Sequence, residues 1–197
     1  MDDLIQVIKI LNSSEIEQVN QYIDNLEFRE CTVFTKNSKK PKVGKIRTST
    51  GTSLNDDCAI TQLIHKAINK GLEEYKRKIQ KIHYVFGNYP VPGGVSTKSW
   101  REKIQVLDYK KGQEYNFHKD EVSNPELREY HRKISVILYL KEATKGGGTL
   151  FPHFGIKPKP GNALIFPSNW CYPHAGEPVY AGTKRVAVTW YYVEQTD

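Results

Sequence analysis

Apolar residues in the first part of the chain recur every three or four positions, which is the period of an amphipathic helix. The first such series is Ile16, Val19, Ile23 and Leu26. Ser14 and Glu17 have the spacing of a capping box, so we predict that this helix begins at Ser14. Residues 4–11 alternate weakly between apolar and polar and predict a strand ahead of the helix.

A second helical pattern begins near Asp56 or Asp57. Its apolar positions define one face of the predicted helix and are Ile60, Leu63, Ile64, Ala67, Ile68 and Leu72. Residues 35–53, between the two helices, are rich in Lys, Ser, Thr and Gly. That composition predicts a loop with short strands.

The pattern changes after about residue 82, where short β-branched and aromatic runs are separated by Gly, Pro and Asn. These runs predict strands at residues 104–109, 134–140, 148–151, 162–166 and 186–193. Many short strands after two helices indicate an α+β, mainly β fold: a double-stranded β-helix (jelly roll) with N-terminal helices packed outside. We expect one domain over residues 1–197, with a helical support region at 1–85 and the jelly-roll core at 100–195.

The composition is that of an ordinary soluble globular protein, with 38% hydrophobic and 26% charged residues. No apolar run is long enough to cross a bilayer, and the start of the chain lacks the features of a signal peptide. The three cysteines are far apart and odd in number, which is untypical of a disulfide framework or a zinc cluster. We therefore expect a cytoplasmic protein with reduced thiols.

The net charge of +7 is concentrated in two places. The first is a loop at residues 36–47, and the second is a group of basic residues that we expect to follow the second helix: Lys76, Arg77, Lys78 and Lys81. A basic surface favours acidic partners, including nucleic acid or an acidic polypeptide. No aromatic-interleaved nucleic-acid motif accompanies the charge, so a solvated surface is the favoured interpretation. Residues 87–100 form a Pro/Gly-rich connection of the kind often used as a lid or binding element.

Candidate chemistry begins with the histidines. His118 is followed two residues later by Asp120, and side chains at i and i+2 of a strand point to the same face. His174, just before the last predicted strand, supplies a third ligand. Two His and one carboxylate form the facial arrangement of non-haem Fe(II) oxygenases. His131 and His153 are rival ligands, but neither has a carboxylate two residues on.

A second group of residues suits a 2-oxo acid that chelates the metal. Lys184, ten residues after His174, can pair with a distal carboxylate as a point charge. Tyr139 can donate a hydrogen bond to the same carboxylate. Arg185 is the rival to Lys184, and adjacent residues on one strand face opposite sides, so only one of them can point inward.

These residues lie within segments that resemble the collagen- and plant-type prolyl 4-hydroxylases of the 2-oxoglutarate oxygenases. The resemblance runs from about residue 45 to residue 193. Its segments, in the order of that family, are RTSTGT, VLDYKKGQEYNFHKD, RKISVILYL, GGGTLFPHFGIKPKPGNALIF and HAGEPVYAGTK. The ten-residue step from the distal His to the Lys also matches.

The resemblance implies a role for each residue at a matching position. The implied metal ligands are His118, Asp120 and His174, and the implied contacts to 2-oxoglutarate come from Lys184, Tyr139, Tyr109 and Thr149. The implied cofactor is Fe(II), with 2-oxoglutarate and O₂ as co-substrates and ascorbate as reductant. The products would be succinate, CO₂ and a hydroxylated substrate. Asp120 argues against a halogenase, whose carboxylate position must be vacant for halide.

The implied substrate is a prolyl residue in a peptide or protein. Tyr115, Arg132 and Trp190 match positions that face the peptide in the family. Tyr192 is a departure, because these hydroxylases commonly have His there. The stretch between residue 166 and His174 is also short, so both departures bear on the substrate.

Other functions remain compatible with the sequence. The same chemistry could act on another side chain, a free amino acid or nucleic acid, although the nucleic-acid demethylases of this superfamily place two arginines near the last strand and only Arg185 lies there. A non-catalytic jelly-roll binding module is the alternative from a different class. The intact set of His118, Asp120, His174 and Lys184 argues against it.

Overall fold

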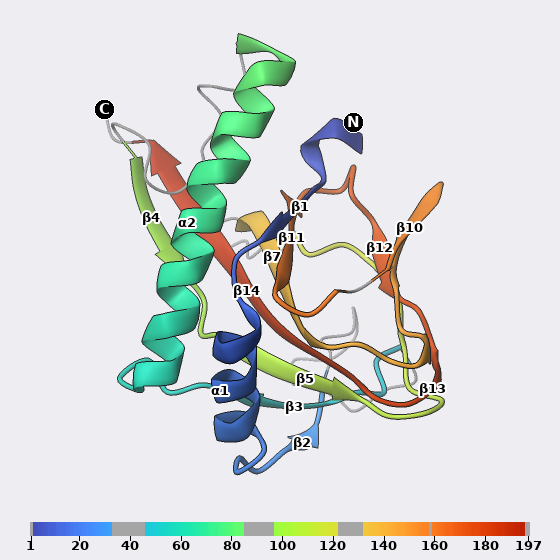
Figure 1. The fold of residues 1–197 in the computed structure, drawn as a ribbon. Helices are drawn as coiled ribbons and strands as arrows, with labels where there is room; N and C mark the ends of the chain where they lie inside the picture. The colour runs from blue at the N-terminus through green and yellow to red at the C-terminus, as the bar shows by residue number, and fades with distance from the viewer. Residues whose placement is uncertain (1, 33–45, 85–96, 122–131, 158, 196–197) are drawn as a thin grey trace.

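The computed structural model describes residues 2–32, 46–84, 97–121, 132–157 and 159–195. Among these residues, eight strands form one large antiparallel sheet (Figure 1). Seven of them follow one path in the order β1 (Gln6–Lys9), β11 (Asn162–Pro167), β7 (Arg132–Lys141), β14 (Lys184–Gln195), β5 (Gln105–Tyr109), β3 (Thr50–Ser53) and β2 (Arg29–Glu30). The eighth, β4 (Thr97–Arg101), pairs with the far end of β14.

A smaller sheet packs against one face of the large sheet. Its four strands in the described residues are β10 (Phe154–Ile156), β9 (Thr149–Phe151), β12 (His174–Gly176) and β6 (Tyr115–His118). A further pair consists of β13 (Val179–Ala181) and β8 (Lys145–Gly146). Buried side chains that include Leu107, Phe151 and Phe166 fill the space between the sheets. The predicted mainly β jelly roll is confirmed.

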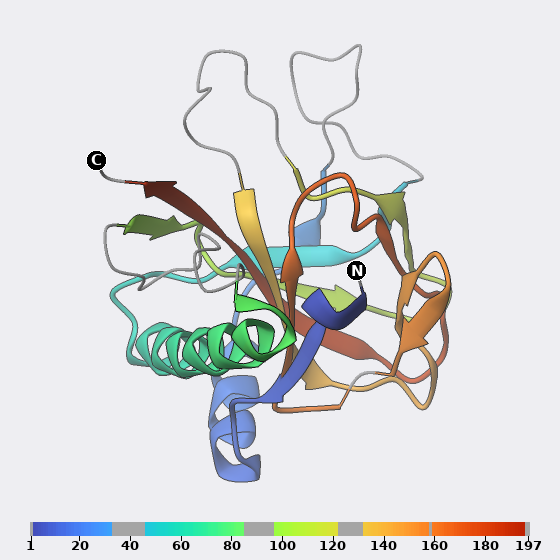
Figure 2. The same cartoon turned by 90° about the horizontal axis from the view of Figure 1, so that it is seen from above.

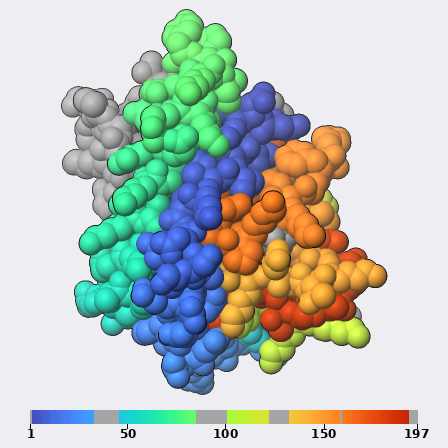
Figure 3. All heavy atoms as spheres, viewed as in Figure 1, coloured from blue at the N-terminus to red at the C-terminus, as the bar shows by residue number. Residues whose placement is uncertain are grey.

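The helices cover the opposite face of the large sheet, as Figure 2 shows. A short helix, η1 (Asp2–Leu4), is followed by α1 (Ser13–Ile23) and the long α2 (Ala59–Ile82), and α1 and α2 lie side by side on the surface in Figure 3. Val19, Ile64 and Leu72 pack with residues from the sheet's outer face in one buried cluster. Alternation along β5 divides the core, because Val106 faces the helices and Leu107 faces the smaller sheet.

An ion-pair network fastens α1 to the large sheet. Arg185 is buried, and its Nε and Nη2 donate to the two carboxylate oxygens of Asp108 at 2.6 and 2.8 Å. These residues are direct partners in the β14–β5 pairing. Nη1 of Arg185 donates to Asp24 at the end of α1 at 2.7 Å. The guanidinium therefore points to the helical side of the sheet, where its charge is fully paired.

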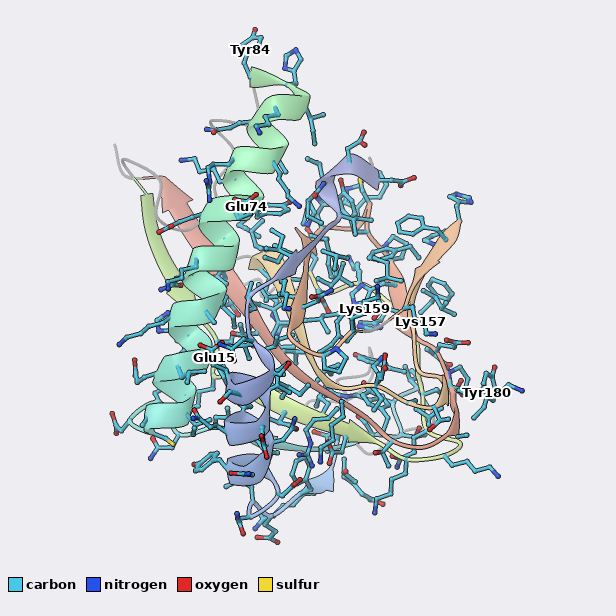
Figure 4. The ribbon with its side chains drawn as sticks, viewed as in Figure 1. Glu15, Glu74, Tyr84, Lys157, Lys159 and Tyr180 are labelled. Carbon is cyan, nitrogen blue, oxygen red and sulfur yellow. The ribbon has the colours of Figure 1, made fainter. Side chains whose placement is uncertain are left out.

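Two predicted details of the helices are wrong. The first helix begins at Ser13 and its cap is Asn12, not Ser14, because the Asn12 side chain accepts from the Glu15 amide at 3.0 Å while Glu15 (labelled in Figure 4) accepts from the Asn12 amide at 2.8 Å. The second helix continues to Ile82, so the basic group at residues 76–81 lies within α2 and does not follow it.

Two predicted details of the strands are also wrong. The strand β6 ends at His118, so Asp120 lies beyond it, and the argument from alternation along one strand does not place this residue. The expected loop at 87–100 contains the start of β4. The rest of that loop, residues 36–45 of the basic loop, and His131 lie outside the described residues. None of the helices in the described part of the chain is both long and apolar enough to cross a bilayer.

The cap of α1 gives a first testable prediction. Asn12→Ala removes the side-chain oxygen that accepts from the Glu15 amide, one of the two hydrogen bonds of the capping box, and should lower the free energy of unfolding by about 1 kcal/mol. Ser14→Ala is the matched control, because Ser14 is exposed and should change stability by less than about 0.5 kcal/mol. Chemical denaturation measures both values, and equal losses in the two variants would contradict the assignment of the cap.

Candidate metal centre and its cavity

The three residues predicted to bind a metal lie together between the two sheets. His118 ends β6 and His174 begins β12, and the two are direct partners in the antiparallel pairing of these strands. Asp120 follows β6 and brings its carboxylate between the rings, 3.5 Å from Nε2 of His118 and 3.6 Å from Nε2 of His174. One ligand atom from each residue lies within 4.8 Å of the others. The predicted triad is therefore confirmed.

Backbone hydrogen bonds orient both imidazole rings. Nδ1 of His118 lies 2.9 Å from the carbonyl oxygen of Asn116, and Nδ1 of His174 lies 3.2 Å from that of Tyr172. A carbonyl only accepts, so each Nδ1 carries the proton and each Nε2 presents a lone pair to the centre. Burial lowers the pKa of His174, which keeps this ring neutral. Both rings are thus ready to bind a metal through Nε2.

Asp120 is a buried carboxylate that stays charged. Only 6% of the residue is exposed. Burial alone would raise its pKa, but the facing His174 and His118, together with hydrogen bonds, hold that pKa below the ordinary value. A buried anion needs a compensating positive charge, which a metal ion bound by the three residues would supply. Two nitrogens and one carboxylate also form the donor set of non-haem Fe(II) sites, so these residues fit Fe(II).

The triad lies in a cavity of about 1140 Å³ that opens along the inner face of the large sheet. The site residues predicted from the sequence that line it are His118, Asp120, His174, Lys184, Tyr109, Thr149, Tyr115, Arg132 and Trp190. Tyr139 is the exception, since it lies behind Thr149, with its hydroxyl 2.8 Å from Oγ1 of that residue. The cavity is large enough to hold both a small acid and part of a larger substrate.

Lys184 supplies a buried cation at one end of this cavity. Only 3% of the residue is exposed, and its Nζ donates to the carbonyl oxygen of Gly148 at 3.3 Å. The ammonium also lies 5.1 Å from the centre of the Tyr109 ring. Burial lowers the pKa of Lys184 to about 8, against the opposing charge of Glu177. Its neighbour Arg185 points to the other face of the sheet, as alternation along β14 requires.

The opposite side of the metal centre carries a cluster built around Arg132. Its guanidinium donates to Glu102 through Nε and Nη2 at 2.5 and 2.7 Å, and its Cζ lies 3.7 Å from the centre of the Trp190 ring. The hydroxyl of Tyr192 also hydrogen-bonds to Glu102. Tyr115 stacks on His118 with ring centres 3.6 Å apart. Arg132 and Trp190 therefore lie together at one side of the centre, and Tyr115 covers His118.

Several residues of the site were not predicted from the sequence. Glu102 pairs with Arg132, yet a single Glu before a strand carries no signal of that role. Ser135 donates to Asp120 at 2.7 Å, and its signal is visible as one small polar residue in the apolar run of β7. The rival ligand His153 is exposed in the turn between β9 and β10 and lies outside the triad.

Comparison with known sequences matches the part of the chain that contains the site. Residues 104–192 match the sequence family described as the 2OG-Fe(II) oxygenase superfamily. Prolyl 4-hydroxylase 2 of Arabidopsis thaliana is 31% identical over 153 residues, which cover 56% of this chain and 51% of that protein. A putative prolyl 4-hydroxylase of Acanthamoeba polyphaga mimivirus is 36% identical over 107 residues, covering 46% and 44% of the two chains. The chain thus spans about half the length of these curated relatives.

Comparison with solved structures supports the same fold over nearly the whole chain. The viral collagen prolyl hydroxylase of Paramecium bursaria Chlorella virus-1, solved as a 2OG complex, superposes with a TM-score of 0.69. The match covers 96% of each chain at 23% sequence identity. At that identity the likeness establishes the fold alone.

The metal centre predicts that substituting a ligand weakens metal binding, whereas substituting a histidine outside the triad does not. Asp120→Ala or His174→Ala removes one of three ligands and should weaken Mn(II) or Fe(II) binding roughly 100-fold or more, because even residues that only support ligands contribute 10- to 100-fold. His153→Ala is the matched control and should bind metal like the parent. Titration calorimetry under anaerobic conditions measures the affinities. Unchanged affinity in His174→Ala would show that the assignment of this ligand is wrong.

Proposed function

We propose that this chain is a prolyl 4-hydroxylase-like member of the 2OG-Fe(II) oxygenase superfamily and that it hydroxylates a prolyl residue in a peptide or protein. The reaction consumes 2-oxoglutarate and O₂ and releases succinate and CO₂. The observation that carries this proposal is the complete iron-binding triad with Lys184 in the same cavity. A jelly roll that served only as a binding module would have no need for this combination.

His118, Asp120 and His174 would hold the iron, which when bound supplies the redox chemistry that activates O₂ against the 2-oxo acid. The protein contributes orientation, charge and exclusion of water. Asp120 and His174 are almost fully buried, so the reacting groups would meet away from bulk solvent. Asp120 supplies the anionic part of the ligand set.

Lys184 would anchor the distal carboxylate of 2-oxoglutarate. Its ammonium is buried, and its one direct hydrogen bond among the described residues is to the Gly148 carbonyl, so the charge is available to an incoming anion. A charge-assisted bond in such a site is stronger than the same bond in water. Tyr109 borders the ammonium, and Thr149, supported by the Tyr139 hydroxyl, lines the cavity.

The peptide would enter on the side of Tyr115, Arg132 and Trp190. Tyr115 and Trp190 offer aromatic faces for a pyrrolidine ring, and the Arg132 guanidinium is held by Glu102 in a fixed position. Tyr192 shares Glu102 with Arg132, so the departure at this position lies in the wall that would contact the substrate. The choice among peptide sequences would be made there.

The role of Lys184 predicts how co-substrate binding responds to mutation and to pH. Lys184→Ala should weaken 2-oxoglutarate binding roughly 10- to 100-fold, the value of a charge-assisted bond, while metal affinity stays unchanged. The parent should lose affinity as the pH rises above about 8, where the lysine becomes neutral, and Lys184→Ala should lack this dependence.

The exposed Lys157 (labelled in Figure 4) provides the matched control, because Lys157→Ala should keep the parent's affinity and pH dependence. Calorimetric titration of each Mn(II)-loaded protein with 2-oxoglutarate, at several pH values, measures the affinity in the parent and in both variants. If Lys184→Ala binds the acid as the parent does, another group is the anchor.

The substrate is tested by product analysis. Purified protein with Fe(II), 2-oxoglutarate and ascorbate is incubated with peptides that contain Pro-Gly, poly-Pro or Ala-Pro sequences. We expect a mass increase of one oxygen atom on a prolyl residue together with an equal amount of succinate. Asp120→Ala serves as the inactive control. Succinate formation that no prolyl peptide stimulates would support the same chemistry on another target and would contradict prolyl hydroxylation.

A further inference from the structure

Asp120 differs from the two histidines in how the fold holds it. His118 and His174 are fixed by the β6–β12 pairing, but β6 ends two residues before Asp120, which belongs to no strand. Its carbonyl oxygen accepts from Nη1 of Arg132 at 3.2 Å. Its carboxylate oxygen Oδ2 accepts from the hydroxyl of Ser135 at 2.7 Å. Both donors come from β7, and Trp190 of β14 also hydrogen-bonds to the Asp120 side chain, so side chains of the large sheet replace the missing strand pairing.

Ser135 is an unusual residue for its place in the sheet. It is fully buried in β7, between Ile134 and Val136, which are also buried. A hydroxyl in such a position is unfavourable unless it has hydrogen-bond partners. Its partners are Asp120 and Ser168, whose Oγ lies 2.8 Å away.

The direction of these hydrogen bonds follows from the number of protons. An ionised carboxylate only accepts, so Ser135 must give its single hydroxyl proton to Asp120. Ser168 must then donate its own proton to Ser135. The chain runs from Ser168 through Ser135 to Oδ2 of Asp120, and a donated bond at one end strengthens the next. Ser168 follows β11, and its amide bonds to the Lys133 carbonyl, so the outer end of the chain is fixed to the sheet.

We infer that Ser135 is a positioning residue for the metal centre, which holds the Asp120 carboxylate in the orientation that binds the metal. The hydrogen bond occupies Oδ2 and restricts rotation of the carboxylate, which leaves Oδ1, on the His118 side, to the ion. Ser168 supports this bond by donating to Ser135. The inference rests on the proposed function for the identity of the metal, but its test needs no turnover.

The test compares variants that differ only in the hydroxyl. The side chains introduced by Ser135→Thr and Ser135→Val have nearly the same shape, and both are larger than serine. Only the threonine hydroxyl can donate to Asp120. We expect Ser135→Val and Ser135→Ala to weaken Mn(II) binding roughly 10- to 100-fold, as loss of a partner of a ligand does elsewhere, and Ser135→Thr to restore most of the affinity. Ser168→Ala should have a smaller effect in the same direction.

Thr189→Val is the matched control. Thr189 is a buried residue of the adjacent strand β14, and its hydroxyl donates to the carbonyl oxygen of Glu102 at 2.7 Å and to no metal ligand. This variant should lose stability while keeping the parent's affinity for Mn(II). Thermal unfolding of every variant, with and without Mn(II), separates folding from binding.

The outcomes decide between a positioning role and a purely structural one. Parent-like Mn(II) affinity in Ser135→Ala would overturn the inference, even if that variant unfolds more easily. Equal affinity in Ser135→Thr and Ser135→Val would also overturn it, because volume alone would then explain the effect. Should Ser135→Val not fold, Ser135→Ala, which only removes atoms, still gives the answer. If the predicted metal affinities are found but no peptide is hydroxylated, the proposed function fails and the role of Ser135 stands.

Discussion

The site depends on the pairing of two short strands. Where β12 lies antiparallel to β6, His174 falls directly opposite His118, and residues distant in the sequence become neighbours. Each ring is then fixed by a backbone carbonyl two residues before it, which sets the tautomer and turns Nε2 to the same point. A shift of this pairing by one residue would turn one histidine to the other face of the sheet. The remaining parts of the site are arranged around this fixed pair.

The strand β14 joins the stability of the fold to the chemistry of the cavity. Its successive residues Lys184 and Arg185 point to opposite faces. Lys184 places a buried positive charge in the cavity, whereas Arg185 closes an ion-pair network with Asp108 and Asp24 that holds α1 on the outside. The network therefore helps to fix the strand that carries the lysine. The helices contribute no metal ligand, but they cover the sheet on which the site is built.

Asp120 was predicted correctly as a metal ligand, but the structural reason given for it was wrong. The His-x-Asp spacing was interpreted as two positions on one face of a strand, but the strand ends at His118. The carboxylate reaches the centre because Ser135 donates to it and Arg132 donates to the backbone carbonyl of the same residue, both from β7. The cap of α1 was predicted wrongly for a related reason. Asn12 and Glu15 form the capping box, although Ser14 and Glu17 have the same spacing two residues later. Spacing alone could not choose between these pairs, since the choice depends on where the chain leaves the preceding strand.

The sequence by itself determined the fold class, the two helices, most strands of the large sheet and the residue types at the metal centre. It did so because the period of apolar residues reports burial, and because two His, an Asp and a Lys in this order suit one kind of chemistry. Only the tertiary structure decided how the metal ligands are oriented, that Arg185 pairs with Asp108 and Asp24 while Lys184 faces the cavity, and how Ser135 and Glu102 contact the site. Those facts arise from contacts between strands that are distant in sequence, and no local pattern records such contacts.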